Sequence, residues 1–330
     1  MRKILPPLLR ITRLTGRVLR WLLLAIGLLW VLGLFIYQPV CLVSVPVVLA
    51  AWWWVLRRRI EWALWCIFAL GAVAYLLLPG PQPDKWQASW ERAPQFTLDG
   101  DSLTVHNLRD FRYRTEQDFD CNWRTEIYNL SQITGADFAE CHWDGMEAIC
   151  HTMLSFSFAD GKHLVISAET RLPEGEEQNA IAGLYKRYGL LYLFGTEEDI
   201  FALRTNYRHE DLLLMPLDVT PQTARAMLLH LVQLAQQTEQ RHTAYNTLSN
   251  NCSSGVMSTF RHVTPGMPAI YNLAPVHNGS ISRLLYRHGG FITRPGESYN
   301  DLRKRCYLRY DIAPGEPQKY SAAIRAAISR

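Results

Sequence analysis

The pattern of hydrophobic positions divides the chain into an apolar amino-terminal part and a longer mixed part. Three apolar runs, each of 17 residues without a charged side chain, cover residues 21–37, 40–56 and 62–78. Seventeen residues is the lower limit for a helix that crosses about 30 Å of hydrocarbon. No small-residue cleavage site follows the first run, which argues against a secretory signal peptide. We therefore predict that residues 1–78 form a membrane anchor of three transmembrane helices.

The mixed part begins after a proline-rich boundary. Pro79-Gly-Pro-Gln-Pro cannot continue a helix, so residues 79–94 are predicted to be a linker. Alternating patterns then predict strands over 95–107, 124–130, 151–158 and 163–168. Helical patterns predict one helix over 179–188 and another that begins at the Thr220 cap and Pro221. Residues 95–330 are thus predicted to form one α+β domain.

Charge distinguishes the same two parts of the chain. Residues 1–83 hold nine Lys/Arg and one acid, whereas the other 247 residues hold 25 Lys/Arg and 29 acids. By the positive-inside rule the basic clusters before residue 21 and at 57–59 belong in the cytoplasm. Three crossings then place the body in the periplasm, and an even number would leave it in the cytoplasm. The acidic balance of the body argues against nucleic acid as a partner.

Candidate chemistry starts from Cys252. It lies in Tyr245-Asn-Thr-Leu-Ser-Asn-Asn-Cys-Ser-Ser-Gly, where Asn251 can cap a helix that begins at the thiol. A helix amino terminus stabilises a thiolate, and the thiolate is the nucleophilic form of cysteine. A cysteine at a helix start is more often structural, so this signal needs a partner residue.

The predicted partner is a histidine at the start of a β-hairpin. Alternation over 151–158 and 163–168 places an apolar face on one side and His151, Ser167 and Glu169 on the other. A three-residue loop, Asp160-Gly161-Lys162, would pair Met153 with Glu169 and leave Glu169 diagonal to His151, within side-chain reach. An imidazole oriented by a carboxylate beside a thiol is typical of cysteine nucleophiles. The alternative is a surface polar pair without a catalytic role.

The other cysteines and histidines allow further interpretations. Cys141-His142 and Cys150-His151 could offer four zinc ligands, but their spacing matches no common structural zinc site. A disulfide between Cys141 and Cys150 is the preferred interpretation in an oxidising compartment, and no metal is predicted. His242, ten residues before Cys252, is a minor alternative as the base.

Four blocks of the mixed part resemble a known family. In chain order they are His151-Thr-Met-Leu-Ser-Phe, Ser167-Ala-Glu-Thr-Arg171, Leu203-Arg-Thr-Asn-Tyr207 and Tyr245-Asn-Thr-Leu-Ser-Asn-Asn-Cys252. Over a region of about 100–264 they resemble the bacterial family described as the Lnb amino-terminal periplasmic domain. That family is similar to the permuted papain-like (NlpC-like) cysteine enzymes, in which the histidine strand precedes the nucleophile helix.

The resemblance implies roles for individual residues. Cys252 corresponds to the nucleophile, His151 to the general base and Glu169 to the group that orients the imidazole. The backbone N–H of Cys252 would donate to an oxyanion. The positions that would shape the substrate-binding site are Arg171, Tyr245 and Asn251. The tail after Pro265 matches no motif with an assigned role.

The resemblance also implies an activity. The family takes its name from lipoprotein N-acyltransferases, which move an acyl chain from a phospholipid through a cysteine thioester to a lipoprotein. We therefore expect a multi-pass protein of the bacterial inner membrane with a cytoplasmic amino terminus. Its partners would be the lipid bilayer, a phospholipid acyl donor and a lipoprotein or other amine acceptor, with no cofactor. The alternatives are a cysteine hydrolase (amidase or peptidase) of the cell envelope and an inert envelope scaffold.

Overall fold

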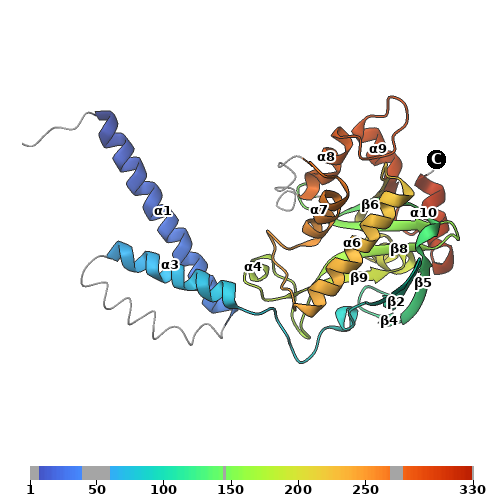
Figure 1. Cartoon of the computed structure of the whole chain (residues 1–330), viewed down its shortest axis with the longest axis horizontal. Helices are drawn as coiled ribbons and strands as arrows, with labels where there is room; N and C mark the ends of the chain where they lie inside the picture. The colour runs from blue at the N-terminus through green and yellow to red at the C-terminus, as the bar shows by residue number, and fades with distance from the viewer. Residues whose placement is uncertain (1–6, 39–59, 144–145, 268–277, 329–330) are drawn as a thin grey trace, which may run out of the picture. The chain divides into compact units, whose positions relative to one another are not determined.

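A computed structural model describes residues 7–38, 60–143, 146–267 and 278–328 of the chain (Figure 1). The chain divides into two compact units. The first unit comprises Met1–Pro79 together with Asn179–Arg187, and the second comprises Gly80–Gln178 and Tyr188–Arg330. Each unit is described by itself below.

The first unit is built on two helices that pack against each other, α1 (Pro7–Tyr37) and α3 (Ile60–Leu77). Glycines bring the two helices close together. A Cβ atom on Gly27 would lie 2.8 Å from the ring of Phe68, and one on Gly71 would lie 2.7 Å from Val31. Close packing over small residues is typical of helix pairs in membranes.

One helix among the described residues is long and apolar enough to cross a membrane, so the prediction of three is corrected. It is the part of α1 that spans Val18–Tyr37. The third predicted span forms α3, but its apolar stretch, Leu64–Leu77, is shorter. At 1.5 Å per residue that stretch reaches only about 21 Å, less than the hydrocarbon thickness. The second predicted span, 40–56, lies outside the described residues.

The segment Asn179–Arg187 belongs to the first unit although its neighbours in sequence belong to the second. The Lys186 ammonium donates to two backbone carbonyls at the end of α3, at 2.9 and 3.0 Å, where a cation offsets the helix dipole. The helix predicted over 179–188 is only one turn, α4 (Ala180–Gly183). Lys186 has a φ of 57°, which is incompatible with a continued right-handed helix.

The second unit contains a nine-stranded mixed sheet in the spatial order β1-β2-β9-β8-β7-β6-β10-β11, with β5 also paired to β2. Neighbouring strands are antiparallel except β2 and β9. Strands β3 and β4 form a separate ladder. The strand bounds are β1 Gln95–Asp99, β2 Ser102–Arg109, β3 Arg112–Tyr113, β4 Phe119–Asp120, β5 Trp123–Asn129, β6 Ile133–His142, β7 His151–Phe158, β8 His163–Arg171, β9 Gly189–Gly195, β10 Asp211–Pro216 and β11 Tyr307–Leu308.

Helices pack on both faces of this sheet. Their bounds are α5 Glu197–Ala202, a π-helical turn η4 Leu203–Tyr207, α6 Pro221–Gln240, α7 Cys252–Val263, α8 Ile281–Arg287, α9 Tyr299–Cys306 and α10 Tyr320–Ile328. Leu154 of β7 shares one buried cluster with Met227 of α6 and Met257 of α7. The opposite cluster includes Phe201 of α5 and Ile324 of α10. The body is therefore a mixed α+β domain, as predicted.

The β7–β8 hairpin has a register that differs by two residues from the prediction. Met153 pairs with Ser167, and not with Glu169. The difference arises in the loop. The Phe158 N–H donates to the carbonyl of Lys162 at 3.0 Å, so the three-residue loop covers 159–161 and begins one position earlier than the predicted loop, 160–162. This places Gly161 at the last loop position with a φ of 83°, where glycine is favoured in three-residue hairpin loops. The shift is even, so every side chain keeps its predicted face.

The tail after Pro265 is part of the same domain. Strand β11 pairs with β10, and α10 covers one face of the sheet. The Arg325 side chain of α10 forms ion pairs with Asp137 of β6 and Glu197 of α5. Glu197 also accepts a 2.7 Å hydrogen bond from Ser155 of β7. These buried contacts fasten the carboxyl terminus to the strands that carry the candidate site.

Candidate active site

Helix α7 begins at the thiol, as predicted. The Asn251 side chain accepts a hydrogen bond from the Ser254 backbone N–H at 3.1 Å, and the Ser254 hydroxyl accepts one from the Asn251 backbone N–H at 2.9 Å. This reciprocal capping box fixes the first turn of the helix. Cys252 is therefore the first helical residue, with 7% of its surface exposed. The positive end of the helix dipole favours the thiolate at this position.

His151 lies at the first position of β7, and its imidazole is close enough to the Cys252 thiol to lower the pKa of that thiol. The Nε2 atom of the ring lies 2.6 Å from the Ser167 hydroxyl and 3.2 Å from Glu169 Oε1. His242, the alternative base, lies in the turn that follows α6.

Glu169 lies on the side of the sheet that carries His151, which confirms the predicted face. Ser167 lies between the two groups, because its hydroxyl donates to Glu169 Oε1 at 2.6 Å and accepts from His151. Hydrogen bonds therefore run without a break from the Glu169 carboxylate through the Ser167 hydroxyl to the His151 imidazole. They hold the imidazole ring in one orientation toward the thiol.

Arg204 is a site residue that sequence reasoning did not single out. It lies in the π-helical turn η4, and its guanidinium nitrogen is 3.3 Å from Glu169 Oε1. The side chain is buried and also approaches Glu210 at 3.9 Å. The signal was present in the block Leu203-Arg-Thr-Asn-Tyr207, which carried the family resemblance without a role. Arg204 helps to keep the buried Glu169 ionised.

The electrostatics of the cluster favour an ion pair between thiolate and imidazolium. Burial raises the pKa of Cys252, but His151, the Thr152 backbone N–H and the Ser253 hydroxyl together lower it to about 7. Burial lowers the pKa of His151, but Glu169 and Cys252 raise it to about 9. The pKa of Glu169 is held well below its usual value, because His151 and Arg204 outweigh its burial.

The three predicted site-shaping residues have hydrogen-bond partners inside the protein, and the Tyr245 backbone N–H donates to the Tyr188 carbonyl at 2.9 Å. Asn251 caps α7, and its amide nitrogen donates to the Thr247 carbonyl at 2.8 Å. The Arg171 guanidinium donates to the carbonyls of Trp90 and Glu91 at 2.8 and 2.7 Å. The lining residues of the site thus have clear structural contacts. The substrate contacts of Arg171, Tyr245 and Asn251 stay a prediction.

The predicted disulfide is wrong, because Cys141 and Cys150 are both free thiols. Cys141 pairs with His151 across the β6–β7 ladder, so Cys150 lies opposite His142. Alternation therefore directs the two cysteine side chains to opposite faces of the sheet, where no disulfide can form. The Cys141 thiol instead donates to Glu210 at 2.9 Å.

The fold and this cluster define an α+β protein with a cysteine, a histidine and a glutamate arranged around a helix start. A family model of the Lnb N-terminal periplasmic domain matches residues 119–284, half of the chain. The chain belongs to this family. No curated protein and no solved structure matches it. The matched region contains the whole Cys252, His151 and Glu169 cluster, and with the apolar amino-terminal helix it indicates a membrane-anchored envelope protein with a periplasmic domain.

Proposed function

We propose that the protein is a thiol-dependent acyltransferase that acts through a thioester on Cys252. The observation that carries the proposal is the position of Cys252 at the start of α7 beside His151, which Ser167 and Glu169 hold in place and which lowers the thiol pKa to about 7 despite burial. A thiolate beside an imidazolium is the reactive form of a cysteine nucleophile. The same arrangement, with the histidine strand before the nucleophile helix, supports a permuted papain-like (NlpC-like) relationship.

The first half-reaction forms the thioester. The Cys252 thiolate attacks the ester carbonyl of a phospholipid, and the carbon–oxygen bond to the glycerol then breaks. The His151 imidazolium gives its proton to the departing alcohol, so a lysophospholipid leaves and the acyl group stays on sulfur. Backbone N–H groups at the start of α7, including that of Cys252, are placed to stabilise the oxyanion.

The second half-reaction transfers the acyl group to an amine. The amine of a lipoprotein, or another amine acceptor, attacks the thioester carbonyl while neutral His151 takes its proton. The carbon–sulfur bond breaks, an amide forms, and the thiolate and imidazolium are restored. Glu169 and Ser167 hold the imidazole in one orientation through both steps. No cofactor takes part in either step.

A membrane location supports this choice of substrate. The amino-terminal helix would hold the thiol near acyl chains that water excludes, which raises their effective concentration. We propose an anchor that crosses the membrane an odd number of times, with a cytoplasmic amino terminus and the body in the periplasm. Phosphatase fusions after residue 90 should then be active. If cytoplasmic reporters fused at the same point are active instead, the body lies in the cytoplasm and a lipid of the outer leaflet cannot be its substrate.

An acyl-transfer assay tests the function. The full-length protein in mixed micelles would receive an acyl-labelled phospholipid, with and without a diacylated lipopeptide that has a free amino terminus. The proposal predicts labelled amide only when the lipopeptide is present and the thiol is intact. Labelled free fatty acid in both samples would identify a hydrolase of the same site. If no reaction is detected and Cys252→Ala equals wild type in every functional assay, the protein is an envelope scaffold and not an enzyme of this site.

A further inference from the structure

Three metal-ligand side chains meet beside the candidate active site, on the other face of the same two strands. Glu140 and His142 lie two residues apart on β6, so they share one face, and Cys150 lies opposite His142 at the start of β7. One donor atom from each residue lies within 4.8 Å of the other two. All three side chains are buried, with 0–5% of their surfaces exposed.

The carboxylate in this cluster lacks a partner for one oxygen. Oε1 of Glu140 lies 2.6 Å from Nε2 of His142, whereas Oε2 is buried with no hydrogen-bond partner among the described residues. A buried carboxylate oxygen without a partner is costly, and such a group calls for an explanation. A bound cation at this point would supply the missing partner.

The histidine has the orientation of a metal ligand. Its Nδ1 atom lies 3.1 Å from the carbonyl of Met146, and a carbonyl can only accept, so Nδ1 carries the hydrogen. In a neutral ring Nε2 then presents a lone pair toward Glu140 Oε1. A second-shell carbonyl on one ring nitrogen and a metal on the other is the usual arrangement at metal sites.

We propose that Glu140, His142 and Cys150 bind a thiophilic divalent cation of the zinc class. Sulfur, nitrogen and oxygen donors together suit zinc, whereas magnesium and calcium take oxygen ligands. Binding releases the Cys150 proton, and the cation replaces the proton held between Glu140 and His142. Thiolate, carboxylate and a divalent cation then sum to no net charge, which suits a buried site.

The geometry needs a small adjustment of the side chains. Ligand atoms of a tetrahedral zinc site lie roughly 3.3–3.8 Å apart, given bonds of about 2.0–2.3 Å. Glu140 Oε1 and His142 Nε2, at 2.6 Å, would need to move apart, whereas a donor pair at the upper limit of 4.8 Å would need to approach by about 1 Å. Side-chain rotation can supply both changes. Three protein ligands leave a fourth position for water.

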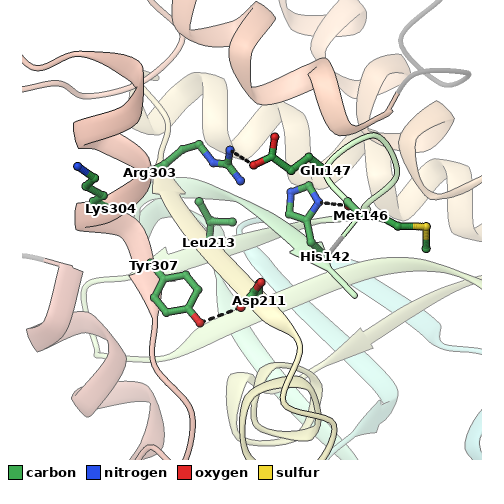
Figure 2. A pocket seen from close by; sticks show the side chains of 8 residues that line it. All are labelled: His142, Met146, Glu147, Asp211, Leu213, Arg303, Lys304 and Tyr307. Atoms are coloured by element: carbon green, nitrogen blue, oxygen red, sulfur yellow. Dashed lines mark hydrogen bonds and ion pairs between the residues drawn. The ribbon is translucent and has the colours of Figure 1, made fainter. Parts of the chain in front are cut away.

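A pocket of about 380 Å³ gives access to the site (Figure 2). His142 lies in its wall, and the pocket also carries the carboxylates of Glu147 and Asp211. Figure 2 shows these acidic groups on either side of the His142 imidazole, with Glu147 paired to Arg303 and Asp211 to Tyr307. The wall also carries Arg303 and Lys304, so the two carboxylates are balanced by two cationic side chains.

The metal site would support the strand that carries the candidate base. Cys150 directly precedes His151, and its carbonyl lies 3.9 Å from the Cys252 sulfur. Asn278 already holds the same residue, since it accepts from the Cys150 N–H at 3.0 Å and donates to the Cys150 carbonyl at 2.6 Å. A cation that joins Cys150 to β6 would fix the start of β7, a structural role that does not depend on the proposed acyl transfer.

Metal titration of the full-length protein in detergent tests the site. The protein would be stripped with a chelator, titrated with Zn²⁺ and measured for bound metal, and Co²⁺ would report a thiolate ligand through its charge-transfer absorption. Wild type should bind about one ion per chain and melt at a higher temperature with Zn²⁺. Cys150→Ser and His142→Asn should each weaken binding by more than about 100-fold, beyond the effect of a second-shell change.

Matched variants separate this site from the neighbouring thiol. Cys141→Ser removes an adjacent buried thiol on the opposite face and should leave Zn²⁺ affinity unchanged. Cys252→Ala should also keep the ion. Metal-free Cys150→Ser and His142→Asn would be compared with metal-free wild type by thermal unfolding, so that misfolding is distinguished from ligand loss. The proposal is overturned if stripped wild type takes up no Zn²⁺, or if Cys252→Ala loses the ion while Cys150→Ser keeps it.

Discussion

Two buried thiols, Cys150 directly before β7 and Cys252 at the start of α7, differ sharply in their electrostatics. Burial raises the pKa of both Cys252 and Cys150. For Cys252 the His151 imidazole reverses the effect and brings the pKa to about 7. For Cys150 the carboxylate of Glu140 adds to it and holds the pKa well above the usual value. Burial is thus common to the two sites, and the neighbouring charge decides which thiol is reactive.

The other two buried body cysteines in the described residues, Cys141 and Cys306, follow the same rule. Burial and Glu210 raise the pKa of Cys141, although Arg204 opposes them. Burial also raises the pKa of Cys306 to about 12. Among the buried cysteines of the described residues, Cys252 is therefore the activated thiol, and the comparison between Cys252 and the others can be tested by reactivity.

The largest expected effect is the pH dependence of alkylation in the wild-type protein. The thiolate of Cys252 forms as pH rises through about 7, so its alkylation rate should increase about 100-fold between pH 5 and pH 8. Cys141 and Cys150 should react only at much higher pH. Iodoacetamide labelling with peptide mapping would measure all of them in one sample. Equal rates at Cys252 and Cys150 would refute the comparison.

Removal of the imidazole should abolish most of the difference between the thiols. In His151→Ala burial acts on Cys252 without the opposing charge, so its pKa should rise by about two units and its alkylation rate at pH 7 should fall by roughly 50-fold. Labelling at pH 7 checks this, with Cys306→Ala as a control of unchanged rate. A rate in His151→Ala equal to wild type would mean that the helix start alone activates the thiol.

The carboxylate should have a smaller effect, because it acts through the imidazole. Glu169→Gln removes the charge that stabilises the His151 imidazolium, so the pKa of Cys252 should rise by about one unit and alkylation at pH 7 should slow about fivefold. The pH titration of labelling measures this shift. Ser167→Ala keeps the carboxylate and should change the rate less. If Ser167→Ala slowed alkylation more than Glu169→Gln, the Ser167 hydroxyl would make the main contribution to the lowered pKa of Cys252.

The helix cap should have the smallest effect. Asn251→Ala leaves the first turn of α7 without its side-chain acceptor, and the loss of such a cap costs about 1 kcal/mol in the free energy of unfolding. Thermal or urea unfolding would show the change. Asn251→Asp keeps a capping oxygen and should retain most of the stability. Equal stability of the alanine and wild-type proteins would show that the capping box contributes little here.

Local signals in the sequence predicted the parts of the site that depend on adjacent residues. Asn251 before Cys252 predicted the start of α7, and alternation placed Glu169 and His151 on one face. The loop position was less certain from sequence, because Gly161 fits either the middle or the last position of a three-residue loop. Only the tertiary structure decides which.

Long-range contacts explain what the sequence did not reveal. Arg204 reaches Glu169 only because η4 packs beside β8, and no periodic pattern predicts that. Strand β9, Gly-Leu-Leu-Tyr-Leu-Phe-Gly, is buried on both faces, so it lacks the alternation that marks a half-buried strand. The disulfide prediction failed for a related reason, since β6 and its register with β7 decide the faces of Cys141 and Cys150.

The covalent intermediate on Cys252 is the central claim, and peptide mapping by mass spectrometry tests it most directly. The full-length protein would be incubated with phospholipid vesicles without an acceptor, then digested and mapped. We expect a fatty acyl mass on the Cys252 peptide, sensitive to hydroxylamine and missing from Cys252→Ala. An acyl mass on another cysteine, or none on wild type while product forms, would contradict the account.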